Sequence, residues 1–213
     1  MATIDQWNAT WRELGAADSP ALQDAFEDLV ARYAEPHRKY HTLEHLDECL
    51  ATFANVRALA GRPAEVEVAL WFHDAIYDTR SNSNEKQSAA LAASTVREAL
   101  GSPECAGRVG ALVMATRHVE LPTDGDTRLL VDVDLSILGA NPVRFDAYER
   151  QVREEYAWVP DMVFRTKRRK ILEGFLARPA IFSTPYFRQR LEARARANIA
   201  RSLEVTSTRH DGG

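Results

Sequence analysis

The sequence of 213 residues predicts an all-α fold, and three observations favour this class. Apolar residues recur along most of the chain at the i, i+3, i+4 spacing that places them on one face of a helix. Four times, a Ser, Asn or Thr stands directly before a proline and opens such a run, which is typical of a helix N-terminus. Runs with the alternating pattern of a half-buried strand are absent from the sequence.

The helix starts are marked most clearly by Ser19-Pro20, Ser102-Pro103, Asn141-Pro142 and Thr184-Pro185. In such a pair the first side chain accepts a hydrogen bond from the first turn, and proline occupies a position that needs no amide donor. The expected helices, with ends defined to about 2 to 4 residues, cover residues 3–14, 20–34, 42–60, 63–78, 84–100, 103–118, 126–139, 142–157, 161–177 and 185–204.

Length and composition are those of one domain of ordinary size, spanning 1–213. The hydrophobic fraction of 45% and the charged fraction of 27% match an average globular protein. The net charge of −4 gives no overall attraction to nucleic acid, so we expect no nucleic-acid partner. A homo-oligomer is compatible with the sequence.

The start of the chain has no signal-peptide pattern, and no apolar run reaches the roughly 20 residues that span a bilayer. We therefore expect no membrane partner and a cytoplasmic location. Two cysteines, Cys49 and Cys105, lie far apart in helical patterns. They form neither a disulfide framework nor a thiolate metal site, so we interpret both as buried reduced thiols.

A histidine and a carboxylate end the apolar stripe of the helix expected over 63–78. Val66, Leu70 and His73 fall on one helical face, which carries His73 inward, and Asp74 follows it. Burying a carboxylate without a partner costs several kcal/mol. No Lys or Arg lies within four residues upstream, so a bound metal ion is a strong candidate for the partner.

Further ligand candidates lie on two other helices. His41 and His45 are one turn apart, so both imidazoles face the same way. Asp134 lies on an apolar stripe. Asp132 is rotated by about 200° from it, so we interpret Asp132 as a carboxylate that is either solvated or hydrogen-bonded to a ligand from outside the ligand set. His118 ends the preceding helix, where either the helix dipole or a role in the site would explain it.

These residues resemble the His, His-Asp, Asp signature of the HD superfamily of metal-dependent phosphohydrolases, through His45, His73-Asp74 and Asp134. The resemblance covers roughly residues 35 to 205 and is closest to a branch of predicted HD hydrolases. The motifs that carry it are Tyr40-His41 to His45, Trp71-Phe72-His73-Asp74-Ala75-Ile76-Tyr77-Asp78, Asn84-Glu85 to Ser88-Ala89, and Asp134-Leu135-Ser136-Ile137-Leu138-Gly139.

The resemblance implies an HD-like helical bundle with its motif core at about 35–140 and additional C-terminal helices at about 141–205. It also implies one divalent ion, drawn from Mn, Mg, Co, Ni, Zn and Fe. The ligands would be His45, His73, Asp74 and Asp134. Cyclic-nucleotide phosphodiesterases share the Tyr-His-x-x-x-His form, which makes His41 the general acid. Other HD enzymes have an Arg-x-x-His ligand, which would match Arg38 and His41 instead.

The same resemblance implies a reaction in which metal-activated water attacks the phosphorus of a small phosphorylated metabolite, with a nucleotide as the leading substrate class. Arg38 and His118 are expected to contact the phosphate, and Asp78 and Glu85 to orient water or substrate. Two alternatives stay open. One is an oxygenase that uses two irons on the same scaffold, and the other is a non-catalytic sensing module with a structural metal.

Overall fold

The computed structural model describes residues 2–119 and 121–208 and, within them, confirms the all-α class. In order, its elements are α1 (Ile4–Glu13), α2 (Pro20–Tyr33), α3 (Leu43–Val56), η1 (Arg57–Leu59), α4 (Pro63–Phe72), α5 (Asn84–Leu100), α6 (Pro103–Met114), η2 (Ala115–Arg117), α7 (Gly125–Asp134), η3 (Leu135–Gly139), α8 (Pro142–Glu155), α9 (Asp161–Ala177) and α10 (Pro185–Thr208). The η elements are short 3₁₀ helices. No strand occurs in the described ranges.

The proline-marked helix starts lie where the sequence predicted them. The side chains of Ser19, Ser102 and Asn141 each accept a hydrogen bond from a backbone amide of the first turn. The fourth helix begins at Pro185. These starts are local, since each depends on a side chain and a proline next to the helix it begins.

The chain divides into two compact units, Met1–Asp134 and Leu135–Gly213. Their boundary lies near the expected end of the motif core, and the single functional domain over 1–213 stays a prediction. All four residues expected to bind metal belong to the first unit. Among the described residues, no helix is both long and apolar enough to cross a membrane.

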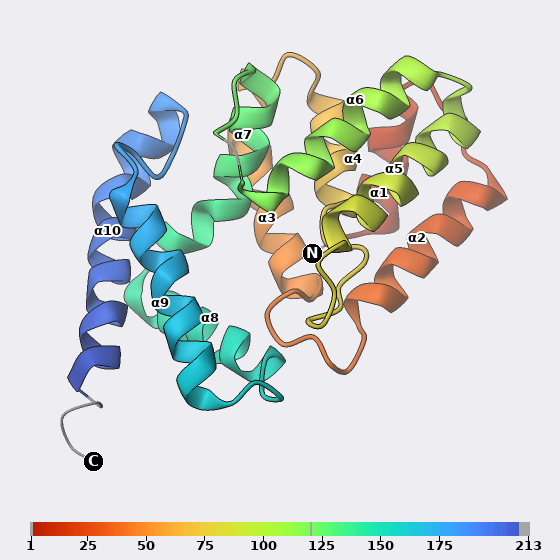
Figure 1. The fold of residues 1–213 in the computed structure, drawn as a ribbon. Coiled ribbons are helices and arrows are strands. Elements are labelled where there is room, and N and C mark those ends of the chain that lie inside the picture. Colours follow the sequence, from red (N-terminus) through yellow and green to blue (C-terminus); the bar gives the residue numbers. More distant parts are fainter. Residues whose placement is uncertain (1, 120, 209–213) are drawn as a thin grey trace. The chain divides into compact units, whose positions relative to one another are not determined.

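The first unit is built around α4, which is buried on every side from Ala64 to Phe72. Helices α1, α3, α5, α6 and α7 all contact it (Figure 1). Apolar residues cover most of the circumference of α4, which favours such enclosure, and its buried Glu65 and Glu67 are paired with Arg108 and Arg57. Because α4 is held on all sides, the residues that follow its C-terminus have a rigid support.

In the second unit, α10 contacts η3 and α9. The side-chain amide of Asn198 donates to the carbonyl oxygens of Leu138 and Ala140, at 2.9 Å each. A Cβ atom at Gly139 would lie 2.6 Å from the side chain of Leu191, so the close approach of η3 and α10 requires glycine there.

Candidate metal centre

The helix predicted over 63–78 ends earlier, at Phe72, and His73 is its C-terminal cap residue. The Nδ1 atom of His73 donates to the carbonyl oxygen of Leu70 at 2.7 Å, so a side chain satisfies one of the last helical carbonyls. A neutral imidazole with its proton on Nδ1 presents a bare Nε2 lone pair. This bond therefore prepares His73 to act as a metal ligand through Nε2.

The segment after α4 is held by two side chains from distant parts of the chain. The hydroxyl of Tyr33 accepts a hydrogen bond from the amide of Asp74 at 3.3 Å. The guanidinium of Arg38 is fully buried and donates to the carbonyl oxygens of Asp74 at 2.7 Å and Ala75 at 3.0 Å. It also donates to the carbonyl oxygen of His41 at 3.1 Å. Arg38 thus joins the His41 segment to the Asp74 segment.

The four residues expected to bind metal converge. His45 Nε2 lies 3.1 Å from His73 Nε2 and 3.3 Å from Asp134 Oδ1. Asp74 Oδ2 lies 3.0 Å from His73 Nε2 and 3.5 Å from His45 Nε2. Both histidines are buried, whereas 18% of the Asp74 side chain and 13% of the Asp134 side chain are exposed to solvent. The cluster is therefore enclosed on its histidine side and open to solvent on its carboxylate side.

The separations between these donor atoms fit a single ion. With bonds of about 2.1 Å, two ligands stand about 3.0 Å apart at a right angle and about 3.4 Å apart at the tetrahedral angle. The donor pairs that include His45 or His73 are 3.0 to 3.7 Å apart. The mixture of imidazole nitrogen and carboxylate oxygen suits Zn, Fe, Co, Ni and Mn ions. The residues present therefore fit a divalent metal.

The charges of the cluster point to a bound cation as well. Burial alone would raise the pKa of Asp74, but the charges of His73 and His41 outweigh it and hold that pKa well below its usual value. Burial also opposes the charged form of both buried histidines. Their carboxylate and other polar neighbours outweigh burial and raise the pKa of His45 and of His73. A divalent ion at this point would supply the positive charge that these carboxylates otherwise obtain from the histidines.

His41 precedes α3, and Thr42 is the capping residue of that helix. The His41 ring stacks on Tyr77, with ring centroids 4.1 Å apart. Its centroid lies 5.9 Å from that of the His45 ring. The side chain is half-buried. His41 thus lies beside the cluster in a position that solvent also reaches.

His118 is brought into the site. Its Nε2 lies 3.0 Å from Asp134 Oδ2, whereas His45 faces the other carboxylate oxygen, Oδ1. His118 has φ of 53° and is the one non-glycine residue with positive φ in the described chain. This conformation is uncommon outside glycine and is enriched at functional sites. The contact favours a role in orienting Asp134, while a phosphate contact stays a prediction.

The other predicted residues, Asp78, Glu85 and Arg38, differ in how they relate to the cluster. Asp78 is exposed, and its carboxylate accepts a hydrogen bond from the amide of Arg80 at 2.8 Å. Glu85 is half-buried in the first turn of α5. In the described ranges, no hydrogen bond or ion pair joins either carboxylate to the four converging residues. The guanidinium of Arg38 faces backbone carbonyls, which favours a positioning role over a phosphate contact.

Two features were missed at the sequence level. Asp132 was expected to be either solvated or a carboxylate outside the ligand set, and its full burial removes the solvated alternative. Cys49 lies in the cluster: one ligand atom from each of His45, Cys49, His73 and Asp134 can be chosen so that all lie within 4.8 Å of one another. The interpretation of Cys49 as a buried thiol is correct but incomplete. Its spacing of four residues from His45 was the signal.

Comparison of the chain with models of protein families, with curated proteins and with solved structures finds no match. The structure therefore establishes an all-α chain with a buried His-Cys-His-Asp group able to hold a metal ion.

Proposed function

We propose that the chain is a metal-dependent phosphohydrolase that cleaves a phosphate ester of a small cytoplasmic metabolite, with a nucleotide as the leading substrate class. One observation carries the proposal. His45, His73, Asp74 and Asp134 bring two imidazole nitrogens and two carboxylate groups together, with the carboxylates partly open to solvent. Their motif resemblance to the HD phosphohydrolases adds the reaction class.

These four residues would hold one divalent ion. Bound there, such an ion supplies a Lewis acid for the phosphoryl oxygens and makes water more acidic, so that hydroxide forms near neutral pH. Burial of His45 and His73 excludes water from one side of the centre. Substrate is therefore expected to approach from the side of Asp74 and Asp134, where solvent has access.

His41 is assigned the proton transfer to the leaving oxygen. As the P–O ester bond breaks, the imidazolium of His41 gives its proton to that oxygen and becomes neutral. Its ring is held by the stack on Tyr77 and by the bond from Arg38 to its carbonyl oxygen. A positioned general acid contributes about 10²- to 10⁴-fold in rate.

His118 and Arg38 complete the arrangement without touching the reacting atoms in this proposal. His118 holds Asp134 through its Oδ2 atom. Arg38 fixes the backbone on which His41 and Asp74 stand. The imidazole of His118 is half-buried and is also able to contact a non-reacting oxygen of the phosphate.

The test is release of inorganic phosphate or of a nucleoside monophosphate by chelator-treated protein reloaded with Mn²⁺, Mg²⁺, Co²⁺, Ni²⁺, Zn²⁺ or Fe²⁺. The panel contains nucleoside 5′-phosphates, cyclic nucleotides, sugar phosphates and nitrophenyl phosphate. We expect hydrolysis that needs added metal and is lost in Asp134→Ala. Hydrolysis by the metal-free protein, or none by fully loaded protein, would refute the proposal.

The same preparations separate the two alternatives. An oxygenase would hold two irons per chain and consume oxygen with a substrate. A sensing module would hold metal and bind phosphorylated compounds without turning them over. The His-Asp arrangement with His41 beside it favours the hydrolase over both.

A further inference from the structure

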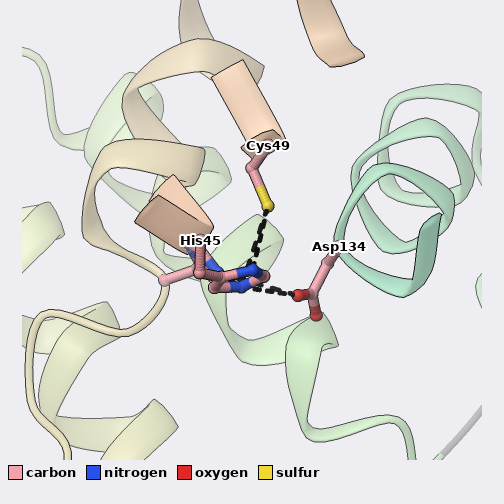
Figure 2. A group of neighbouring side chains, drawn as sticks. His45, Cys49 and Asp134 are labelled. Carbon is pink, nitrogen blue, oxygen red and sulfur yellow. Dashed lines mark hydrogen bonds and ion pairs between the residues drawn. The ribbon is translucent and has the colours of Figure 1, made fainter. Parts of the chain in front are cut away.

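Cys49 adds a sulfur donor to the proposed metal centre. It lies one turn after His45 on α3, and both side chains are buried. Its Sγ atom is 3.8 Å from His45 Nδ1 and 3.7 Å from His45 Nε2. Figure 2 shows Cys49 and Asp134 approaching the His45 ring from different helices. The sulfur thus belongs to the same enclosed group as the predicted ligands.

The sulfur lies among the predicted ligand atoms but not in hydrogen-bond alignment with the His45 ring. Because Sγ is nearly equidistant from the two ring nitrogens, it lies beside the ring and in line with neither N–H direction. In a tetrahedral site with Zn–S of about 2.3 Å and Zn–N of about 2.0 Å, sulfur and nitrogen stand about 3.5 Å apart. The sulfur is 3.7 Å from Nε2 and 3.8 Å from Nδ1, so ligation requires the Cys49 side chain to turn from this position toward the lone pair of Nε2.

Two overlapping donor sets therefore exist around one point. His45, His73 and Asp134 are common to both, and the fourth donor is either Asp74 or Cys49. A carboxylate as fourth donor suits hard ions such as Mg²⁺ and Mn²⁺, whereas a thiolate suits thiophilic ions such as Zn²⁺, Co²⁺ and Cd²⁺. The metal that is bound then decides which side chain completes the set.

We propose that Cys49 is an alternative ligand of this centre and gives it a selective affinity for thiophilic divalent ions. The inference rests on the proposed centre but not on the proposed hydrolysis. The thiol proton passes to solvent as the sulfur–metal bond forms, and no atom changes oxidation state. A thiophilic ion with a thiolate ligand favours tetrahedral coordination, in which four protein donors leave no position for water or substrate, as in structural zinc sites. Thiophilic ions should then inhibit hydrolysis that Mn²⁺ or Mg²⁺ supports.

The first test is the absorption spectrum of chelator-treated protein titrated with Co²⁺. A cobalt–thiolate bond gives a strong near-ultraviolet charge-transfer band, whereas nitrogen and oxygen ligands give only weak visible bands. We expect the band in the wild type and in Cys105→Ser, and its loss in Cys49→Ser. Cys105 is the matched control because it is the other of the two cysteines and is also buried.

The outcomes separate the inference from the proposed function. The cobalt–thiolate band, together with no hydrolysis by protein loaded with Mn²⁺ or Mg²⁺, would support Cys49 as a ligand and refute the phosphohydrolase. Cobalt bound with visible bands alone would overturn the role of Cys49 and leave the metal centre intact. No cobalt bound at all would overturn both. Since Cys105→Ser keeps Cys49 as its single cysteine, this variant decides the question even if Cys49→Ser does not fold.

The second test compares ions. Loss of an outer partner of a metal ligand weakens binding by about 10- to 100-fold, and loss of a ligand should cost at least as much. We therefore expect Cys49→Ser to lose at least about tenfold in Zn²⁺ affinity and to bind Mn²⁺ as the wild type does. Equal losses for both ions, or none for Zn²⁺, would contradict sulfur ligation.

Discussion

At the scale of single residues, the two buried histidines owe their chemistry to different neighbours. His73 has its Nδ1 proton fixed by the carbonyl of Leu70, so its Nε2 atom faces the carboxylates and is the atom available to a metal. His45 is placed by α3 with its Nε2 against Asp134. His41 lies outside this core and stacks on Tyr77. His45 and His73 are therefore expected to bind metal, and His41 to transfer a proton.

His41 and His45 are separated by paired alanine variants. His45→Ala should deplete metal, because a ligand is lost, and His41→Ala should keep it, because an acid is lost. His41→Ala should be slowed by up to about 10²- to 10⁴-fold on nucleoside 5′-phosphates and much less on nitrophenyl phosphate, whose leaving group needs no proton. Metal content and rates across leaving groups are the measurements. Equal metal loss in both variants would make His41 a ligand.

The pH dependence of stability should differ between the metal-free and the metal-loaded protein. The raised pKa of His45 and His73 gives stability that is complete below the unfolded value of about 6.5 and is lost as pH rises through the folded values. Metal needs these imidazoles neutral, so apparent metal affinity should rise over the same range. Urea denaturation and metal titration at pH 6 to 9 check both signs. A metal-free protein that gains stability above pH 6.5 would contradict this assignment.

At the scale of elements, the end of α4 is set by side chains that are remote in sequence. Tyr33 donates to the carbonyl of Trp71, one of the last of the helix, and accepts the amide of Asp74. Arg38 donates hydrogen bonds to the carbonyls of Asp74 and Ala75. These bonds replace the hydrogen bonds that a longer helix would have made. The chain can therefore leave the helix directly after Phe72 without stranding buried polar groups.

Arg38→Lys should weaken both folding and metal binding, although it keeps the charge. A lysine cannot reproduce the forked donation to several carbonyls, so buried acceptors lose their partners. We expect a loss of roughly 3 kcal/mol in the free energy of unfolding and at least about tenfold in metal affinity. The neighbouring exposed residue gives the control, Lys39→Ala, expected within about 0.5 kcal/mol of wild type. Unchanged stability in Arg38→Lys would refute the positioning role.

The helices were predictable because their signals are local. Ser19, Ser102 and Asn141 cap helices that start at the next residue, and the apolar periodicity gave most of the remaining ends. The end of α4 was not predictable from its own residues, since Tyr33 donates to the carbonyl of Trp71 and Arg38 donates to the carbonyls of Asp74 and Ala75 that follow the helix.

The candidate site was predictable in part for the same reason. Apolar stripes carried His45, His73 and Asp134 inward, and these residues do converge. Cys49 was on the same face as His45, but a single buried cysteine is more often a packing residue than a ligand. Its approach to Asp134 depends on how α3 meets α7, which no local pattern encodes. The burial of Asp132 has the same tertiary origin.

At the scale of the molecule, the candidate metal centre lies in one of the two units of the chain. Met1–Asp134 contains every residue of the proposed centre, with α4 enclosed by its neighbours and Asp134 as the last residue of α7. Leu135–Gly213 is a helical unit with its own core, including Phe182 and Ile199. Within the described ranges, the converging donors are therefore a property of the first unit.

Elemental analysis of the purified protein is the most direct test that His45, His73, Asp74 and Asp134 hold an ion. We expect about one divalent ion per chain in the wild type and in His37→Ala, which alters an exposed histidine that binds the carbonyl of Tyr77. His73→Ala and Asp134→Ala should retain little metal while keeping the helical circular-dichroism spectrum. Full wild-type metal content in both of these variants would contradict the metal centre.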